Sequence, residues 1–136
     1  MLITTKNTFL HSLSFLIIFF VLSSASAFGH HGTNASYDMD KTVTLTGTVT
    51  EFVWSNPHCQ LYFDVKDANG MVVSWGGETN SPGNLKAAGW TRDILKPGDK
   101  VTVVLHPSRA GTPVGVIQDL TLPNGKVLSR GGQAGL

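Results

Sequence analysis

Strict alternation of apolar and polar residues marks residues 42–50. Val43, Leu45, Gly47 and Val49 fall on one side of this segment, and threonines occupy the other side. A two-residue period that is rich in β-branched side chains is typical of a half-buried strand. The alternation is lost after Val49. This change predicts a bulge, or a bend between two sheets, at that point.

Further segments have the apolar pattern of strands and end at turn residues. We expect strands at residues 58–66, 71–78, 100–106 and 114–122, with a short extension at 126–129. Glycine-containing turns at 67–70, 96–99 and 124–125 separate them. Such turns join neighbouring antiparallel strands because glycine adopts positive φ angles without strain.

Residues 84–95 have the character of a helix rather than a strand. Their apolar positions include Leu85 and Leu95, and Gly89 interrupts the segment. Thr91 is followed two positions later by an acidic residue, which would lie in the first turn of a helix capped by Thr91. This pattern is typical of a new helix start. We therefore expect two short helical turns in this segment.

The order of three strands, a helical segment and two strands predicts a mainly β fold. A small five-stranded OB-like barrel, with its short helical segment between the third and fourth strands, has this order. We expect the barrel domain to span residues 42–129. An open β-sandwich is the alternative, because the pattern does not show whether the first strand pairs with the fourth.

The N-terminal region has the features of a secretory signal peptide. Residues 13–22 form an apolar run that only Ser14 interrupts, and the small residues Ala25-Ser26-Ala27 follow it. The run suits the hydrophobic region of a signal peptide and is shorter than the ~20 residues of a membrane span. We expect cleavage of residues 1–27 and a periplasmic or secreted protein with no stable membrane anchor. An uncleaved anchor is the alternative.

Removal of this signal leaves a chain whose formal net charge is zero. The loss of Lys6 reduces the ten Lys and Arg to nine, which equal the nine Asp and Glu. Nucleic acid is therefore not an expected partner, because phosphate binding needs clustered cations. Cys59 is the single cysteine, so no internal disulfide can form. It alternates onto the apolar face of its strand with Leu61 and Phe63, which predicts a core thiol.

Histidines follow the expected cleavage site directly. With Phe28 as the first residue, its α-amine, the amides of Gly29 and His30, and one His30 imidazole nitrogen can form a square-planar set. That geometry suits Cu(II) or Ni(II). His31 adds a further ligand. The alternative is a flexible polar arm over residues 28–41, just as we expect a disordered tail over residues 130–136.

His58 is the candidate ligand within the barrel. It alternates onto the more polar face of its strand with Gln60 and Tyr62, directly after an Asn-Pro turn. There it could complete a metal site with His30 and His31. The alternative is a turn histidine that is hydrogen-bonded to the backbone.

The mature chain resembles a family of small exported bacterial proteins that are classed as a domain of unknown function. The resemblance runs from His30 to about Leu128. It rests on His30-His31, Tyr37-Asp38, the strand at 43–49, Trp54 with Asn56-Pro57-His58, residues 64–70 and residues 89–99. It implies a small secreted β-barrel-like module with no established activity. Members often begin at or beside the His-His pair, whereas Phe28-Gly29 precedes it here.

These observations support two classes of function. The first is an exported, non-catalytic binding module that holds copper or a related metal through His30, His31 and His58. The second is a periplasmic adaptor that binds a protein partner or a small apolar ligand through an aromatic face formed by Trp54, Tyr62, Trp75 and Trp90. No catalytic constellation is visible, so we do not expect an enzyme.

Overall fold

A computed structural model describes residues 33–131 of the chain. Its elements in chain order are α2 (Thr33–Ser36), β1 (Val43–Val53), β2 (Gln60–Lys66), β3 (Val72–Glu78), α3 (Pro82–Ala87), β4 (Lys100–Pro107), β5 (Val114–Thr121) and β6 (Val127–Ser129). Each strand predicted from the apolar pattern is present, with ends that differ by a few residues. Among the described residues, no helix is long and apolar enough to cross a membrane.

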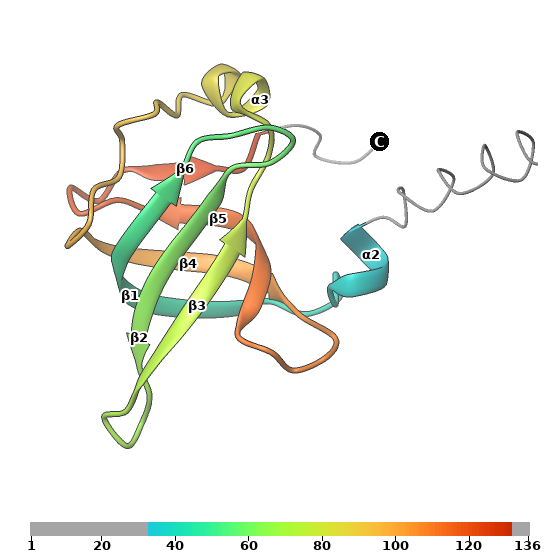
Figure 1. Cartoon of the computed structure of the whole chain (residues 1–136), viewed down its shortest axis with the longest axis vertical. Helices are drawn as coiled ribbons and strands as arrows, with labels where there is room; N and C mark the ends of the chain where they lie inside the picture. The colour runs from blue at the N-terminus through green and yellow to red at the C-terminus, as the bar shows by residue number, and fades with distance from the viewer. Residues whose placement is uncertain (1–32, 132–136) are drawn as a thin grey trace, which may run out of the picture. The chain divides into compact units, whose positions relative to one another are not determined.

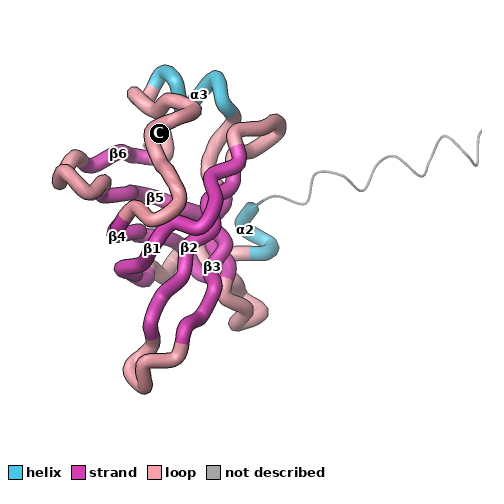
Figure 2. Tube along the Cα trace, turned by 60° about the vertical axis from the view of Figure 1, so that its left-hand side comes forward, coloured by secondary structure: helices cyan, strands magenta, loops and turns pink. Residues whose placement is uncertain are grey.

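Five of the strands close into a barrel. Antiparallel pairing gives the order β3-β2-β1-β4-β5, and β3 then pairs in parallel with β5 to close the wall (Figure 1). Closure confirms the predicted OB-like barrel, and the open sandwich does not form. Figure 2 shows α3 at one end of the barrel and the β2–β3 turn at the other. β6 extends the sheet beyond β5.

The first strand belongs to two parts of the wall. Residues 43–48 pair with β4 and residues 48–53 pair with β2, so Thr48 faces a partner on each side. The pairing register shifts between Val49 and Glu51. This is the bulge that the loss of alternation predicts. It lets β1 bend and change partners without ending, and β1 continues to Val53 for that reason.

The helical segment is shorter than predicted. α3 begins after Ser81, whose side chain accepts a hydrogen bond from the Asn84 backbone N–H, and Pro82 occupies its first turn. It ends at Ala87, because Gly89 adopts a φ of +86° that no helix continues through. The prediction of a second helical turn after Thr91 is wrong. The chain makes hydrogen-bonded turns there before β4.

The core fills the inside of the barrel and its α3 end. Inward-facing residues of the strands alternate with outward-facing polar ones, as the two-residue period predicts. The buried apolar cluster consists of Val49, Cys59, Leu61, Phe63, Leu85, Trp90, Leu95, Val101, Val103, Leu105, Ile117, Leu120, Leu122 and Leu128.

Candidate functional site

The N-terminal histidines lie outside the described residues. His30 and His31 precede Thr33, where the description begins. The predicted copper chelate at the mature N-terminus therefore stays a prediction. Of the predicted tail at residues 130–136, Arg130 and Gly131 are described, and each makes a hydrogen bond to the barrel domain. Residues 132–136 lie outside the description.

The arm that follows these histidines is attached to the barrel wall from Ser36 onward. Ser36 accepts a hydrogen bond from the Arg109 N–H at 3.0 Å, and the Asp38 N–H donates to the Pro107 carbonyl at 2.9 Å. His106 Nδ1 hydrogen-bonds the Lys41 carbonyl oxygen at 2.8 Å. This part of the arm is therefore fixed along the end of β4 and the β4–β5 loop.

Charged groups reinforce that attachment. Asp38 carboxylate oxygens lie 3.1 Å from Lys41 Nζ and 3.7 Å from an Arg109 guanidinium nitrogen. The hydrogen bond from Lys41, with smaller contributions from the Lys41 and Arg109 charges, lowers the pKa of Asp38. The carboxylate is therefore ionised at neutral pH and holds both cations against the arm.

His58 and Glu78 form the central pair of the candidate site. His58 Nδ1 lies 2.6 Å from Glu78 Oε1, and the two side chains are 41% and 20% exposed. The strand register brings them together, because β2 and β3 pair Gln60 with Glu78. His58 is thus partly exposed, in agreement with the polar face that the alternation predicts for it.

The backbone around this pair is well anchored. The Cys59 N–H donates to the Asn80 carbonyl at 3.0 Å, and the Thr79 N–H donates to the Cys59 carbonyl at 2.9 Å. The buried Thr79 hydroxyl donates to the same carbonyl at 3.0 Å. Cys59 and Thr79, which follow His58 and Glu78 in the chain, are therefore hydrogen-bonded to each other. These bonds hold the His58 and Glu78 side chains at a fixed separation.

Glu78 sits in a row of residues across the barrel wall. It pairs with Val116 on β5, which in turn pairs with His106 on β4. Val116 is fully buried yet is not part of the interior cluster. Burial, and secondarily the charge of Glu78, raises the pKa of Tyr37. Tyr37 of the arm thus lies close enough to Glu78 to feel its charge, which brings the arm and the His58–Glu78 pair to one region.

Glu78 was not identified from the sequence, although a signal for it exists. The turn at residues 67–70 fixes the hairpin register, and counting outward from that turn pairs residue 60 with residue 78. Glu78 belongs to that pair, and His58 lies two positions before Gln60 and therefore on the same face. A carboxylate could therefore have been placed beside His58 by hairpin counting alone.

The described residues do not form a complete metal site. No group of three or more His, Cys, Asp or Glu side chains comes together within residues 33–131. His58 offers one imidazole, whose Nδ1 faces Glu78, and Nε2 is the ring nitrogen left to bind a metal. Any metal bound there needs further ligands from the undescribed N-terminal segment or from solvent.

Cys59 does not share a site with His58. It faces the core with no exposed surface, and burial raises the pKa of its thiol. We expect its alkylation by iodoacetamide at pH 8 to be at least about 100-fold slower in the folded protein than in urea, because only the exposed thiolate reacts. Equal rates in the two states, measured by intact mass, would show that the thiol is accessible.

The aromatic side chains do not form a common exposed face. Trp90 is buried at the α3 end of the barrel, where its indole N–H donates to the Ser129 carbonyl. Trp54 and Trp75 are half-buried and pack against the core. Tyr62 is 42% exposed and lies on the outside of β2.

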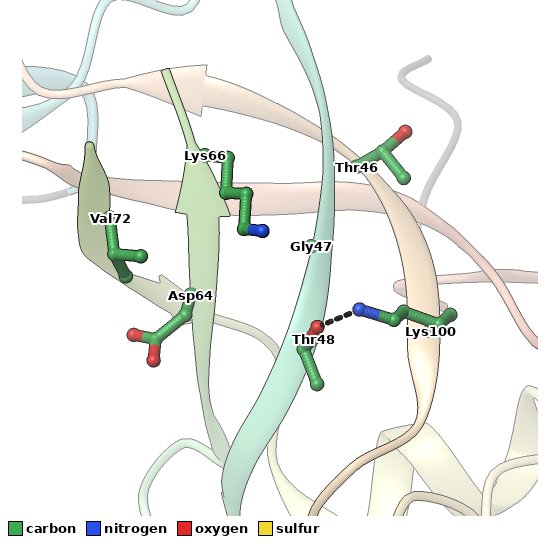
Figure 3. A pocket seen from close by; sticks show the side chains of 7 residues that line it. All are labelled: Thr46, Gly47, Thr48, Asp64, Lys66, Val72 and Lys100. Carbon is green, nitrogen blue, oxygen red and sulfur yellow. Dashed lines mark hydrogen bonds between the residues drawn. The ribbon is translucent and has the colours of Figure 1, made fainter. Parts of the chain in front are cut away.

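A second polar feature lies on the outer wall, away from His58. It is a hollow of about 470 Å³ between β1 and its neighbours, lined by Thr46, Gly47, Thr48, Asp64, Lys66, Val72 and Lys100 (Figure 3). The sequence pattern does not predict this hollow. The residues come from four strands, and their grouping depends on how β1 changes partners.

The comparisons with known proteins give one match. The model of a family described as "Family of unknown function (DUF6152)" matches residues 19–118. No curated protein and no solved structure matches the chain.

Proposed function

Because this chain belongs to the DUF6152 family, whose function is unknown, we propose its function from the geometry of the site and the donor chemistry of the sequence. The protein is an exported, non-catalytic module that binds Cu(II) or a related metal. His30 and His31 supply the N-terminal ligands, and His58 supplies a ligand from the barrel.

One observation carries this proposal: the short contact between His58 Nδ1 and Glu78 Oε1 at 2.6 Å. Metal-binding histidines commonly donate one ring N–H to a carboxylate, which fixes the tautomer and raises the basicity of the other nitrogen. Glu78 meets this requirement, so that Nε2 of His58 carries the lone pair. A histidine that only stabilises a turn needs no such carboxylate.

The N-terminal donors complete the set by their chemistry. Cleavage after Ala27 makes His30 the third residue, and an α-amine, two deprotonated amides and an imidazole give the four-nitrogen plane that Cu(II) prefers. The attachment of Ser36 and Asp38 to the barrel supports a contribution from His58. It tethers the arm to the wall that also carries Glu78.

Copper titration of the processed protein tests this proposal. We expect a d–d absorbance band and one tightly bound Cu(II) near pH 7.5, with intact mass showing both the bound metal and Phe28 as the first residue. Affinity should fall as the pH drops below about 6.5, because imidazoles must be neutral to bind. A protein that starts at Phe28 and shows no Cu(II) binding would overturn the proposal.

Variants separate the contributions of the ligands. His30→Ala removes the imidazole of the planar set and should abolish the band. His58→Ala should weaken binding about 10-fold or more, and Glu78→Gln should act in the same direction by losing the orienting carboxylate. His106→Gln is the matched control and should keep full affinity, because it removes an imidazole while the glutamine amide N–H can still donate to the Lys41 carbonyl. An unchanged affinity in His58→Ala would remove His58 from the site.

A further inference from the structure

The hollow on the outer wall exists because β1 leaves β2. Residues 43–47 of β1 pair only with β4, whereas Val65 and Lys66 of β2 pair only with β3. The two strands therefore diverge beyond the Thr48–Asp64 pair. Gly47, at the point of divergence, is buried and lies close against β2, because a Cβ there would meet the Asp64 carbonyl oxygen at 2.7 Å. The backbone path thus builds a concave surface into the barrel wall.

Two lysines face this hollow from opposite sides. Lys66 extends from β2 and Lys100 from β4, and both ammonium groups point toward the Gly47–Thr48 stretch of β1 (Figure 3). Within residues 33–131, no carboxylate forms a salt bridge with either lysine. Neither ammonium group is therefore held in an ion pair by the described part of the fold.

The one carboxylate of the hollow is engaged elsewhere. Asp64 accepts a hydrogen bond from the Ser74 hydroxyl at 2.6 Å, and in Figure 3 its carboxylate points away from both ammonium groups. With two lysines and one aspartate, the lining keeps a net charge of +1. Its local field therefore favours an anion.

The hydroxyl group of Thr48 adds a directional hydrogen-bond donor beside the two lysines. Lys100 Nζ donates a hydrogen bond to Thr48 Oγ1. The oxygen of Thr48 is thus used as an acceptor, and its own O–H remains able to donate to a ligand. Two ammonium groups and one hydroxyl converge on the same space, and this arrangement suits the several oxygens of a tetrahedral oxyanion.

We propose that this hollow binds a small organic molecule through a phosphate monoester group. Lys66 and Lys100 contact separate phosphate oxygens, and the Thr48 hydroxyl donates to the phosphate. The volume of the hollow is about 470 Å³. One water takes about 30 Å³, so the five heavy atoms of a phosphate group leave part of the hollow unfilled. The remaining space, next to the exposed Val72 side chain, takes the organic part. Two lysines without a longer cationic track do not suit a nucleic acid.

Titrations with glycerol phosphate and with glycerol, followed by backbone amide chemical shifts, test this proposal. The two ligands are a matched pair because only the first carries a phosphate. We expect saturable shifts at Gly47, Thr48, Lys66 and Lys100 with glycerol phosphate, weakening as salt is added, and none with glycerol. Saturation should fall in the millimolar range, since exposed ion pairs contribute little each. Shifts that rise linearly without saturation, or that match those seen with glycerol, would overturn the proposal.

Lysine variants locate the binding. Lys66→Gln and Lys100→Gln should each weaken glycerol phosphate binding about threefold. The control Lys86→Gln removes an exposed charge on α3, outside the hollow, and should bind normally. An equal loss in the control would mean that only net charge matters, and the proposal would fail. Copper binding should stay intact in all three variants, because none of these residues belongs to the proposed metal site.

A vesicle experiment identifies the source of the phosphate. If the protein sediments with phosphatidic acid vesicles, and Lys66→Gln does not, the hollow binds the phosphate of a lipid headgroup. If the protein binds glycerol phosphate but stays in the supernatant, the ligand is a soluble ester.

Discussion

Replacing Trp90 with alanine should lower the free energy of unfolding by about 3–5 kcal/mol. The indole ring is 1% exposed and is among the largest buried side chains of the barrel. Its centroid lies 6.0 Å from that of Phe52, and its N–H donates to the Ser129 carbonyl at 2.8 Å. The truncation leaves a cavity at the α3 end and removes the hydrogen bond that ties this end to β6.

Thermal unfolding followed by circular dichroism measures this effect. Since 1 kcal/mol shifts the Tm of a domain of this size by about 4–8 °C, the loss should exceed about 12 °C. Trp90→Phe is the graded control. It keeps most of the ring volume but loses the N–H, so it should lower the free energy of unfolding by about 1–2 kcal/mol. A Trp90→Ala protein that unfolds within a few degrees of the parent would contradict the assigned packing.

Replacing Gly47 with alanine should destabilise the barrel by about 2 kcal/mol. A Cβ built at Gly47 would lie 2.7 Å from the Asp64 carbonyl oxygen and 2.8 Å from Phe63 Cδ2. One of these atoms belongs to the backbone of a paired strand and cannot rotate away. The change therefore forces β1 and β2 apart at the point where β1 changes partners.

Gly76 provides a matched control in another strand. A Cβ there would lie 3.5 Å from Val114 Cγ1 and 3.6 Å from Tyr62 Cε1, which are ordinary contact distances. Gly76→Ala should therefore be neutral or slightly stabilising, because glycine weakens a strand. Urea unfolding of both variants tests the contrast. Equal effects at the two positions would mean that the close approach at Gly47 relaxes freely.

The strands could be predicted from the sequence because their signal is local. The alternating residues of 42–50 mark β1, and the blurred pattern after Val49 marks its bulge. The end of α3 was harder to place. Leu85 and Leu95 are both buried, as helical residues would be, but Leu95 reaches the core from a turn. Burial alone does not distinguish these two backbone paths, whereas the positive φ of Gly89 does.

The sites were less predictable because they depend on pairing between distant strands. His58 could be identified from its residue type and its face of the strand. Glu78 needed the hairpin register, which counting from the turn supplies. Lys66 and Lys100 are 34 positions apart in the sequence, and they line one hollow only because β1 bends between β2 and β4. No local pattern encodes that bend in full.

The parallel contact between β3 and β5 has a consequence for local unfolding. It joins only three residue pairs, from Gly76–Val114 to Glu78–Val116, and it is the step that closes the barrel. A short parallel pairing opens more readily than the longer antiparallel ones, so amide hydrogen exchange should be fastest here among the barrel strands. Glu78 lies in this pairing. His58 precedes β2, which stays paired with β3 when the β3–β5 contact opens, so the His58–Glu78 contact should survive this opening.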